Sequence, residues 1–170
     1  VEEGMVVLGL ASNGLHAKGY SRARKVLLER VGLALDLFLP ELGCTVGEEL
    51  LKPTRIYVRS LLPLVEEGCI AAMAHITGGG LLENIPRVLP AGLGVELQAG
   101  SWPILPVFEL IEKLGHIDRE EMARTFNLGI GMAVIVASAE AELVAARLRA
   151  AGERVYRIGR VVRGVGVQVV

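Results

Sequence analysis

Three consecutive glycines lie at the centre of the stretch Ala74-His75-Ile76-Thr77-Gly78-Gly79-Gly80-Leu81-Leu82-Glu83-Asn84-Ile85-Pro86-Arg87. The apolar run just before it (70–73) is typical of a short strand, and the leucines and isoleucine after the glycines have helical spacing. A strand that passes through glycines into a helix presents bare N–H groups and the positive helix end, which suits phosphate or another anion. A tight turn without a ligand would need the same glycines, so the pattern leaves both interpretations open.

A similar strand–loop–helix unit occurs earlier in the chain. Residues 5–11 (MVVLGLA) predict a buried strand. A loop of small polar residues with two glycines follows, and Ser21 is expected to cap a helix that reaches Val31. The two loops could face one crevice at the edge of a sheet, where ligands bind in α/β folds.

The rest of the chain alternates between helical and strand patterns. Residues 32–47 look irregular, and Pro63 should kink or shorten the helix that contains it. Further helices are expected over 53–67, from the glycines to about 90, over 103–114, over 118–125 with a capping box at its start, and over 138–152 with Ser138 as cap. Further strands are expected over 94–97, over 132–137 after a third glycine turn at 126–131, and over 155–162 and 165–170 as a hairpin. This order predicts an α+β fold (an α/β sandwich), with a mixed sheet covered by helices.

Composition narrows the class of protein. The 170 residues fit a single domain over 1–170, and 52% hydrophobic residues with a mean hydropathy of +0.48 indicate a packed core. No apolar run approaches the roughly 20 residues that cross a bilayer, so no membrane partner is expected. A net charge of −1 and 4% aromatic residues give no case for nucleic acid. Cys44 and Cys69 lack metal or redox spacing, which favours the cytoplasm. The chain begins at Val1, and we expect a longer protein whose remainder covers part of its apolar surface.

Several polar residues in the glycine-bearing loops are candidates for chemistry, and each also has a structural interpretation. His16 suits acid–base or phosphate chemistry, but a surface histidine would occupy the same loop. His75 could reach a ligand or bond to backbone in the core. Thr77 and Asn84 could bind a phosphate or ribose, or could cap the helix. Asn127 could bind a ligand or occupy a turn. The histidines lack metal-ligand spacing, so no metal site is predicted.

Four blocks of the sequence resemble the C-terminal domain of the aminoimidazole ribonucleotide synthetase (phosphoribosylformylglycinamidine cyclo-ligase) family. Together they cover essentially the whole chain. The first block is shared in outline by related ATP-using enzymes that make formylglycinamidine ribonucleotide, selenophosphate or thiamine diphosphate, whereas the second is long and specific to the cyclo-ligase. The first, second and third blocks are residues 12–21, 74–90 and 124–132, and residues 52–58 also fit.

The resemblance implies a ligase of de novo purine biosynthesis. Such an enzyme closes the ring of formylglycinamidine ribonucleotide to give aminoimidazole ribonucleotide, and it uses ATP and Mg²⁺ and releases ADP and phosphate. The chain would then be the C-terminal half of a longer two-domain enzyme, a cytoplasmic homodimer. Its N-terminal domain, absent here, would bind most of the ATP and the Mg²⁺ and form most of the dimer. The isolated chain would complete the cleft and be inactive alone.

The resemblance also assigns residues, position by position. His16 is the candidate catalytic residue, and no metal ligand is assigned. The family usually has Ser and Asn where this chain has Ala17 and Lys18, and Lys18 could contact a phosphate or point to water. The cleft residues are Ser12, Asn13, Gly14, His16 and Gly19 in the first loop, Thr77, Gly78, Gly79, Gly80 and Asn84 in the phosphate-facing turn, and Asn127 as a supporting residue.

Two other functions stay open at this point. The chain could be a non-catalytic domain that binds a small anion or a partner protein. It could also belong to a related ATP-using enzyme, such as a formylglycinamidine ribonucleotide synthetase or a selenophosphate synthetase.

Overall fold

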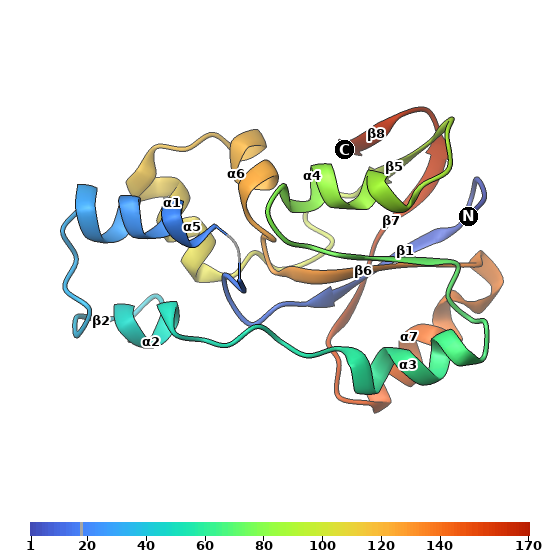
Figure 1. Ribbon diagram of the computed structural model, residues 1–170, viewed down its shortest axis with the longest axis horizontal. Helices are drawn as coiled ribbons and strands as arrows, with labels where there is room; N and C mark the ends of the chain where they lie inside the picture. The colour runs from blue at the N-terminus through green and yellow to red at the C-terminus, as the bar shows by residue number, and fades with distance from the viewer. Residues whose placement is uncertain (18) are drawn as a thin grey trace.

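The computed structural model describes residues 1–17 and 19–170, and these form a mixed six-stranded sheet flanked by helices (Figure 1). The strands are β1 (Val6–Ala11), β4 (Ala72–His75), β5 (Leu93–Leu97), β6 (Ile130–Val136), β7 (Val155–Arg163) and β8 (Gly166–Val169), while β2 (Phe38–Leu39) and β3 (Cys44–Thr45) form a separate pair. The order in the large sheet is β4-β6-β1-β7-β5-β8, and β5 with β8 is its parallel pair. The predicted mixed sheet is confirmed.

Strand β1 lies in the interior of the sheet because its sequence VVLGLA is apolar on both faces. Val6, Leu8 and Leu10 pack on one side and Val7 on the other, each at most 2% exposed. The strand pairs with both β6 and β7. Gly9 is required there, because a Cβ at this position would lie 2.8 Å from the side chain of Ile130.

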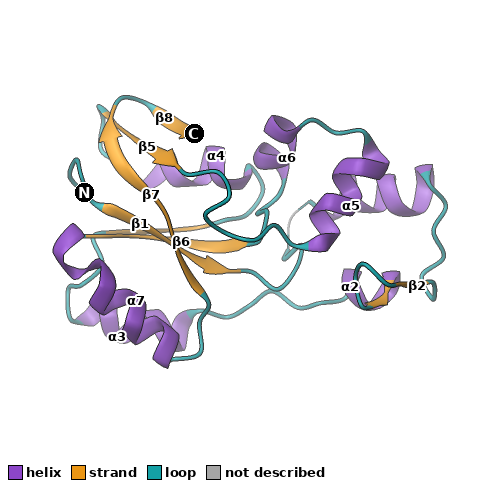
Figure 2. Cartoon of the chain, turned by 180° about the vertical axis from the view of Figure 1, so that it is seen from behind, coloured by secondary structure: helices purple, strands orange, loops and turns teal. Residues whose placement is uncertain are grey.

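The helices of the described residues form two layers and a lobe. They are α1 (Tyr20–Arg24), α2 (Val46–Leu50), α3 (Val58–Glu66), α4 (Gly80–Asn84), α5 (Pro106–Gly115), α6 (Arg119–Thr125) and α7 (Ala141–Ala150), together with a π-helical segment η1 (Lys25–Arg30) and the 3₁₀ turns η2 (Ile85–Val88) and η3 (Ser138–Glu140). Helices α3 and α7 lie side by side on one face of the sheet, and α4 with η2 covers the other (Figures 1 and 2).

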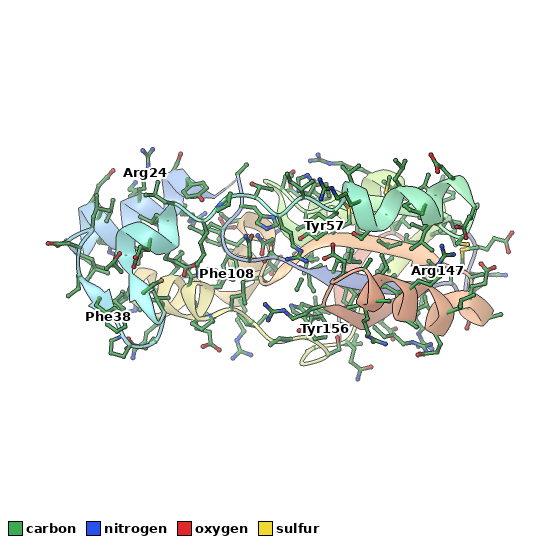
Figure 3. The ribbon with its side chains drawn as sticks, turned by 90° about the horizontal axis from the view of Figure 1, so that it is seen from below. Arg24, Phe38, Tyr57, Phe108, Arg147 and Tyr156 are labelled. Atoms are coloured by element: carbon green, nitrogen blue, oxygen red, sulfur yellow. The ribbon has the colours of Figure 1, made fainter. Side chains whose placement is uncertain are left out.

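The lobe lies beyond one end of the sheet and has its own core. Helices α1, η1, α5 and α6 pack around Phe108 and Phe126, whose ring centroids are 5.8 Å apart. Figure 3 shows Phe108 inside this lobe and Arg147 on the opposite half of the molecule, where Arg147 of α7 binds Glu67 after α3. The sheet and the lobe therefore meet where the first loop and the 126–131 turn lie.

The C-terminal strands do not form the predicted hairpin. The chain does reverse at Gly164, but β5 lies between β7 and β8, and β8 pairs with β5 instead. Three peptide units span at most about 10 Å, which is just enough to cross one strand at spacings of about 4.8 Å. Glycines permit the crossing, since a Cβ on Gly94 would lie 2.8 Å from the Gly166 carbonyl oxygen.

Some helix ends also differ from the predictions. Ser21 does not cap α1, because the helix begins at Tyr20 after Gly19, whose φ of 85° is left-handed. Ser138 makes no side-chain cap and instead begins η3, a 3₁₀ turn that leads into α7. Asp118 does cap α6, by accepting from the Glu121 N–H at 2.8 Å.

Two segments between the first loop and α3 were misassigned. The region 32–47, predicted as irregular, ends in α2, where Thr45 and Glu48 form a reciprocal capping box. The helix expected from residue 53 begins only at Val58, and the preceding Lys52–Ile56 segment is free of regular structure. Within the described residues, no helix is long and apolar enough to cross a membrane.

Candidate functional site

Three loops meet at one edge of the sheet. Strands β1 and β4 end at this edge, and β6, which runs between them in the opposite direction, begins there. The loops are joined by backbone hydrogen bonds, from Ser12 N to Gly129 O (2.8 Å) and from Ile76 N to Gly131 O (3.0 Å). The expectation that the first two glycine loops share one edge is confirmed, and the third joins them.

The triple-glycine turn is held from inside by Asn84. The buried amide of Asn84 donates to the carbonyl oxygens of Gly80 (2.8 Å), Gly78 (3.2 Å) and Thr77 (3.3 Å). The Thr77 hydroxyl in turn donates to Asn84 Oδ1 at 3.3 Å. Asn84 therefore turns its hydrogen-bonding groups toward the turn itself, and its side chain fixes the shape of the turn.

The N–H groups of the turn remain available. Among the described residues, no acceptor is bonded to the N–H groups of Thr77, Gly78 or Gly79. Three successive free N–H groups beside the start of a helix form a concave seat for an anion. The carboxylate of Glu83 folds back toward this seat, and a Cβ on Gly79 would lie 2.6 Å from its Oε2.

Gly80 has a packing role. Its φ is 56°, and a Cβ there would lie 1.9 Å from the carbonyl oxygen of Ala123 in α6. Only glycine permits this approach of α4 to α6. Gly19 is similar, because its φ is 85° and a Cβ would lie 2.6 Å from the Phe126 ring. Packing therefore requires glycine at Gly19 and Gly80, two of the predicted site residues.

The first loop is held by Asn127, which comes from the third loop. The buried amide of Asn127 donates to Gly14 O (2.9 Å) and Leu15 O (3.3 Å). Its Oδ1 accepts from the Ser12 hydroxyl and from Gly129 N, both at 2.8 Å. Ser12 and Asn127 are therefore bonded to each other, and they tie two loops together.

His16 belongs to the first loop, yet it is only 3% exposed. Asn13 donates its amide to Pro53 O at 2.9 Å, which directs Asn13 Oδ1 toward His16 Nε2 at 2.9 Å. The backbone N–H groups of Asn13 and Arg55 also point at Nε2, each at 3.4 Å, so both tautomers of the imidazole find a partner at this nitrogen. Among the described residues Nδ1 has no hydrogen-bond partner. Burial, His75 and Arg55 lower the His16 pKa to about 4, so the imidazole is neutral at pH 7.

The segment before α3 adds residues to which residue-by-residue reasoning gave no role. Tyr57 (labelled in Figure 3) donates its hydroxyl to Ala11 O at 2.8 Å. Its ring centroid is 6.3 Å from that of His16. Burial raises the pKa of Tyr57, with a smaller contribution from Glu153. Arg55 binds Glu153 at 2.8 Å. The sequence signal that could have pointed to this segment is KPTR, in which two cationic residues flank a proline and a threonine.

Lys52, the first cation of that segment, lies beside the first loop. Its ammonium is 2.5 Å from the buried carboxylate of Glu49, and a Cβ on Gly14 would lie 3.3 Å from the other oxygen of Glu49. His75 reaches the site from β4, with its ring centroid 6.4 Å from that of His16 and its side chain exposed. Lys18, which the sequence suggested as a phosphate contact, lies outside the described residues.

An apolar groove of about 450 Å³ adjoins His75 and Arg55. It runs between α3 and the β4–β6 edge of the sheet. Ile56 is 80% exposed and Val58 61%, which is unusual for aliphatic side chains that lie side by side. The groove is lined by Arg55, Ile56, Tyr57, Val58, Leu61, Leu62, Val65, Met73, His75 and Met132.

Metal ligands are not gathered at this edge. In residues 1–17 and 19–170, no three His, Cys, Asp or Glu side chains are grouped closely enough to hold a metal ion. The site thus offers N–H donors, a neutral imidazole and two arginine or lysine cations already engaged with carboxylates. This set can bind an anion and accept a proton or hydrogen bond.

Comparisons with known proteins agree with this geometry. Residues 2–170 match the family described as AIR synthase related protein, C-terminal domain. Proteins named phosphoribosylformylglycinamidine cyclo-ligase from Geobacillus sp. (strain WCH70) and Bacillus cytotoxicus are 52% and 51% identical over 167 residues. Each match covers 98% of this chain and 48% of the relative. The chain therefore spans about half the length of these relatives.

Solved structures share the fold at lower identity. Thiamine-monophosphate kinase from Stenotrophomonas maltophilia K279a superposes with a TM-score of 0.65 at 20% identity, over 99% of this chain and 50% of the kinase. The hydrogenase maturation protein HypE from E. coli gives 0.61 at 22% identity, over 99% and 47%. T. maritima PurL complexed with FGAR gives 0.60 at 16%, over 99% and 26%. At these identities the likeness concerns the fold alone.

Proposed function

The chain belongs to the family of AIR synthase related proteins, as their C-terminal domain, and from this premise we propose that it forms the C-terminal half of a phosphoribosylformylglycinamidine cyclo-ligase. The identity of about 50% to proteins of that name supports the assignment. The observation that carries it is the triple-glycine turn, with its free N–H groups and its asparagine clamp, at the edge where the three loops meet.

The proposed reaction closes an imidazole ring in two steps. ATP first phosphorylates the formyl amide oxygen of formylglycinamidine ribonucleotide, which makes that oxygen a leaving group. The amidine nitrogen then attacks the same carbon, so that a C–N bond forms, the C–O bond breaks and phosphate leaves with the electron pair. Loss of one N–H proton gives aminoimidazole ribonucleotide, alongside ADP and phosphate.

In this proposal the glycine turn binds the 5′-phosphate of the ribonucleotide. Thr77, Gly78 and Gly79 would donate their free N–H groups to its oxygens. Charge-assisted hydrogen bonds of this kind are stronger than neutral ones, and they fix the orientation of the ligand. Asn84 would act as a positioning residue, since its own amide is bonded to the turn.

His16 is the candidate for proton chemistry in this proposal, because its low pKa keeps the imidazole neutral across the neutral pH range. Its Nδ1 is buried, so this role requires the loops around it to admit a substrate N–H. Contacts at Nε2 from the Asn13 side chain at 2.9 Å and from the Arg55 backbone N–H at 3.4 Å hold the orientation of the ring. Tyr57 and Arg55 would position the ring from the side opposite the loops.

ATP and Mg²⁺ chemistry belongs mainly to the other half of the proposed enzyme. The described residues provide no grouped carboxylates for Mg²⁺, so no step through the metal is assigned to this chain. The relatives are about twice as long as the chain, and the groove beside α3 is open, apolar and continuous with the site. We assign this groove to docking of the N-terminal half, which would also form the homodimer.

The test uses the full-length enzyme, in which both halves are present. Formylglycinamidine ribonucleotide should stimulate ADP release and yield aminoimidazole ribonucleotide, while the 170-residue chain alone should be inactive. Stimulation by another substrate only, or binding without turnover, would reject the cyclo-ligase in favour of a related ATP-using enzyme or a non-catalytic domain.

The glycine turn can be tested separately on the chain itself. Titration with ribose 5-phosphate should shift the amide resonances of Thr77, Gly78 and Gly79 in ¹H–¹⁵N spectra, and ribose should not. The glycines at Gly32 and Gly68, which are distant in sequence and on other turns, serve as internal controls. Uniform or absent shifts at the turn would remove the phosphate assignment even if the enzyme proved active.

A further inference from the structure

A second, larger cavity of about 730 Å³ lies beside α4, the helix that follows the triple-glycine turn. Helices α4 and α6, the 99–104 segment and the end of β8 surround it. Glu83, whose carboxylate folds back toward the triple-glycine turn, is among its lining residues, whereas His16, Asn84 and Asn127 are not. Its size falls in the range of ligand pockets, roughly 300–1,000 Å³.

One wall of the cavity is apolar and aromatic. Trp102 is 8% exposed, and its indole N–H donates to Leu128 O at 3.1 Å. Because the polar edge of the indole is satisfied in this way, the rest of the ring serves as an apolar surface. Leu81, Met122 and Val167 extend this wall from three different elements.

The charged residues around the cavity are mostly acidic. Arg124 is engaged with Glu120 at 2.7 Å, and Arg119 contacts Glu112 at 3.6 Å while 95% of its side chain is exposed. The other two lining carboxylates, those of Glu83 and Glu109, have no ion-pair partner in the part of the chain that the structure describes. The charged lining residues are Glu83, Glu109, Glu112, Glu120, Arg119 and Arg124.

We propose that this cavity binds an amphipathic organic cation, with an apolar or aromatic body against Trp102 and an ammonium or guanidinium group at Glu109. An uncompensated carboxylate beside an apolar wall attracts a cation that also buries apolar area. A positive group near the indole face gains a cation–π attraction as well. The same carboxylates repel phosphates, so the cavity favours an organic cation over an anion.

Trp102 provides the assay, since it is the single tryptophan of the sequence. The probes are 4-phenylbutylamine and 4-phenylbutyrate, which share an apolar body and differ in charge. The amine should change the Trp102 emission of the 170-residue chain saturably and bind at least about tenfold more tightly than the carboxylate. Equal binding of the two probes, or no saturable change with the amine, overturns the proposal.

The position of the cation is tested by substitution. Glu109→Gln should weaken binding of the amine about fivefold, the scale of one partly exposed charge pair. Glu142→Gln, an equivalent change in the first turn of α7, should leave the affinity unaltered. Amine binding by Glu109→Gln as tight as in the original chain would refute the assigned contact. Circular dichroism spectra of the two variants check that the fold is retained.

Discussion

Asn84 and Asn127 both hold loops of the site by bonding to their carbonyl groups, but over different distances along the chain. Asn84 bonds to carbonyl groups four to seven residues away, within one turn. Asn127 bonds to Ser12, Gly14 and Leu15, which are 112 to 115 residues away. The sequence contains three asparagines, and the third, Asn13, orients His16.

Asn84 therefore determines the shape of one turn, whereas Asn127 joins two loops. The local clamp of Asn84 fixes how one turn presents its N–H groups, and the turn remains attached to β4 and α4 without it. The long-range clamp of Asn127 holds the first loop against the third, so its loss exposes both. We therefore expect substitutions at the two clamps to differ in stability cost and in the property they disturb.

Asn127→Ala should give the largest loss. It leaves the Ser12 hydroxyl, Gly129 N and the Gly14 carbonyl without partners in a buried setting, which should lower the free energy of unfolding by about 3 kcal/mol. Urea denaturation measures this, with Gln98→Ala, an exposed amide, as the matched control. A loss no larger than that of Gln98→Ala would mean that the loops are joined by other contacts.

Asn84→Ala should cost less, about 2 kcal/mol, because only its bond to the Gly80 carbonyl is buried, whereas those to Thr77 and Gly78 are partly exposed. In the proposed full-length cyclo-ligase, its main effect should be a higher KM for formylglycinamidine ribonucleotide. Steady-state kinetics at a temperature where the variant is folded measure this. A KM that is unchanged while stability falls would make Asn84 purely structural.

The two loops should also differ in their response to pH. His16 under the first loop has a pKa of about 4 when folded, against 6.5 for the free group. Between these values the unfolded chain binds more protons, so stability is present above about pH 6.5 and is lost as the pH falls toward 4. From pH 7 to pH 5 the loss from this group should be about 1.5 kcal/mol.

Urea denaturation at pH 7 and pH 5 measures this loss, and His16→Gln should remove most of the difference. His75 is exposed, so His75→Gln serves as the comparison on the glycine-turn side. If His16→Gln retains the full pH dependence, another group is responsible.

The smallest change is expected at Glu83. Its carboxylate lies against Gly79, where it competes with an incoming anion. Glu83→Gln should therefore tighten binding of ribose 5-phosphate about two- to threefold, and the free energy of unfolding should change by less than about 0.5 kcal/mol. Amide shifts on titration give the affinity. Weaker binding by the variant would show that Glu83 supports the seat.

Much of the sheet and the glycine loops could be predicted because their signals are local. An apolar run such as VVLGLA is legible as a strand, and glycines before helical spacing mark a turn. The place of β8 could not be predicted, because the choice between β7 and β5 depends on where β5 lies, and β5 is remote in sequence. Ser21 and Ser138 had the residue type of a cap, but tertiary packing set the helix starts.

The same distinction holds for the site. The residue types of Thr77, Gly78 and Gly79 predicted a turn suited to an anion, and among the described residues their N–H groups have no acceptor. The roles of Asn84 and Asn127 as clamps depend on which carbonyl groups reach them, and residue type does not reveal this. The Lys52–Tyr57 segment reaches the first loop only through the folded chain. Its contacts to His16 therefore lay beyond residue-by-residue reasoning.

Strand β1 has a consequence for synthesis on the ribosome. Val6 pairs with Val136, and Val7 with Ile135 and Gly159. At about 5–20 residues per second, β1 leaves the ribosome about 6 to 26 seconds before its first partner is made. Throughout that interval an apolar segment, with both of its hydrogen-bonding edges unpaired, must be kept from aggregating. Translation speed and chaperone supply should therefore control the yield of this protein more than its final stability does.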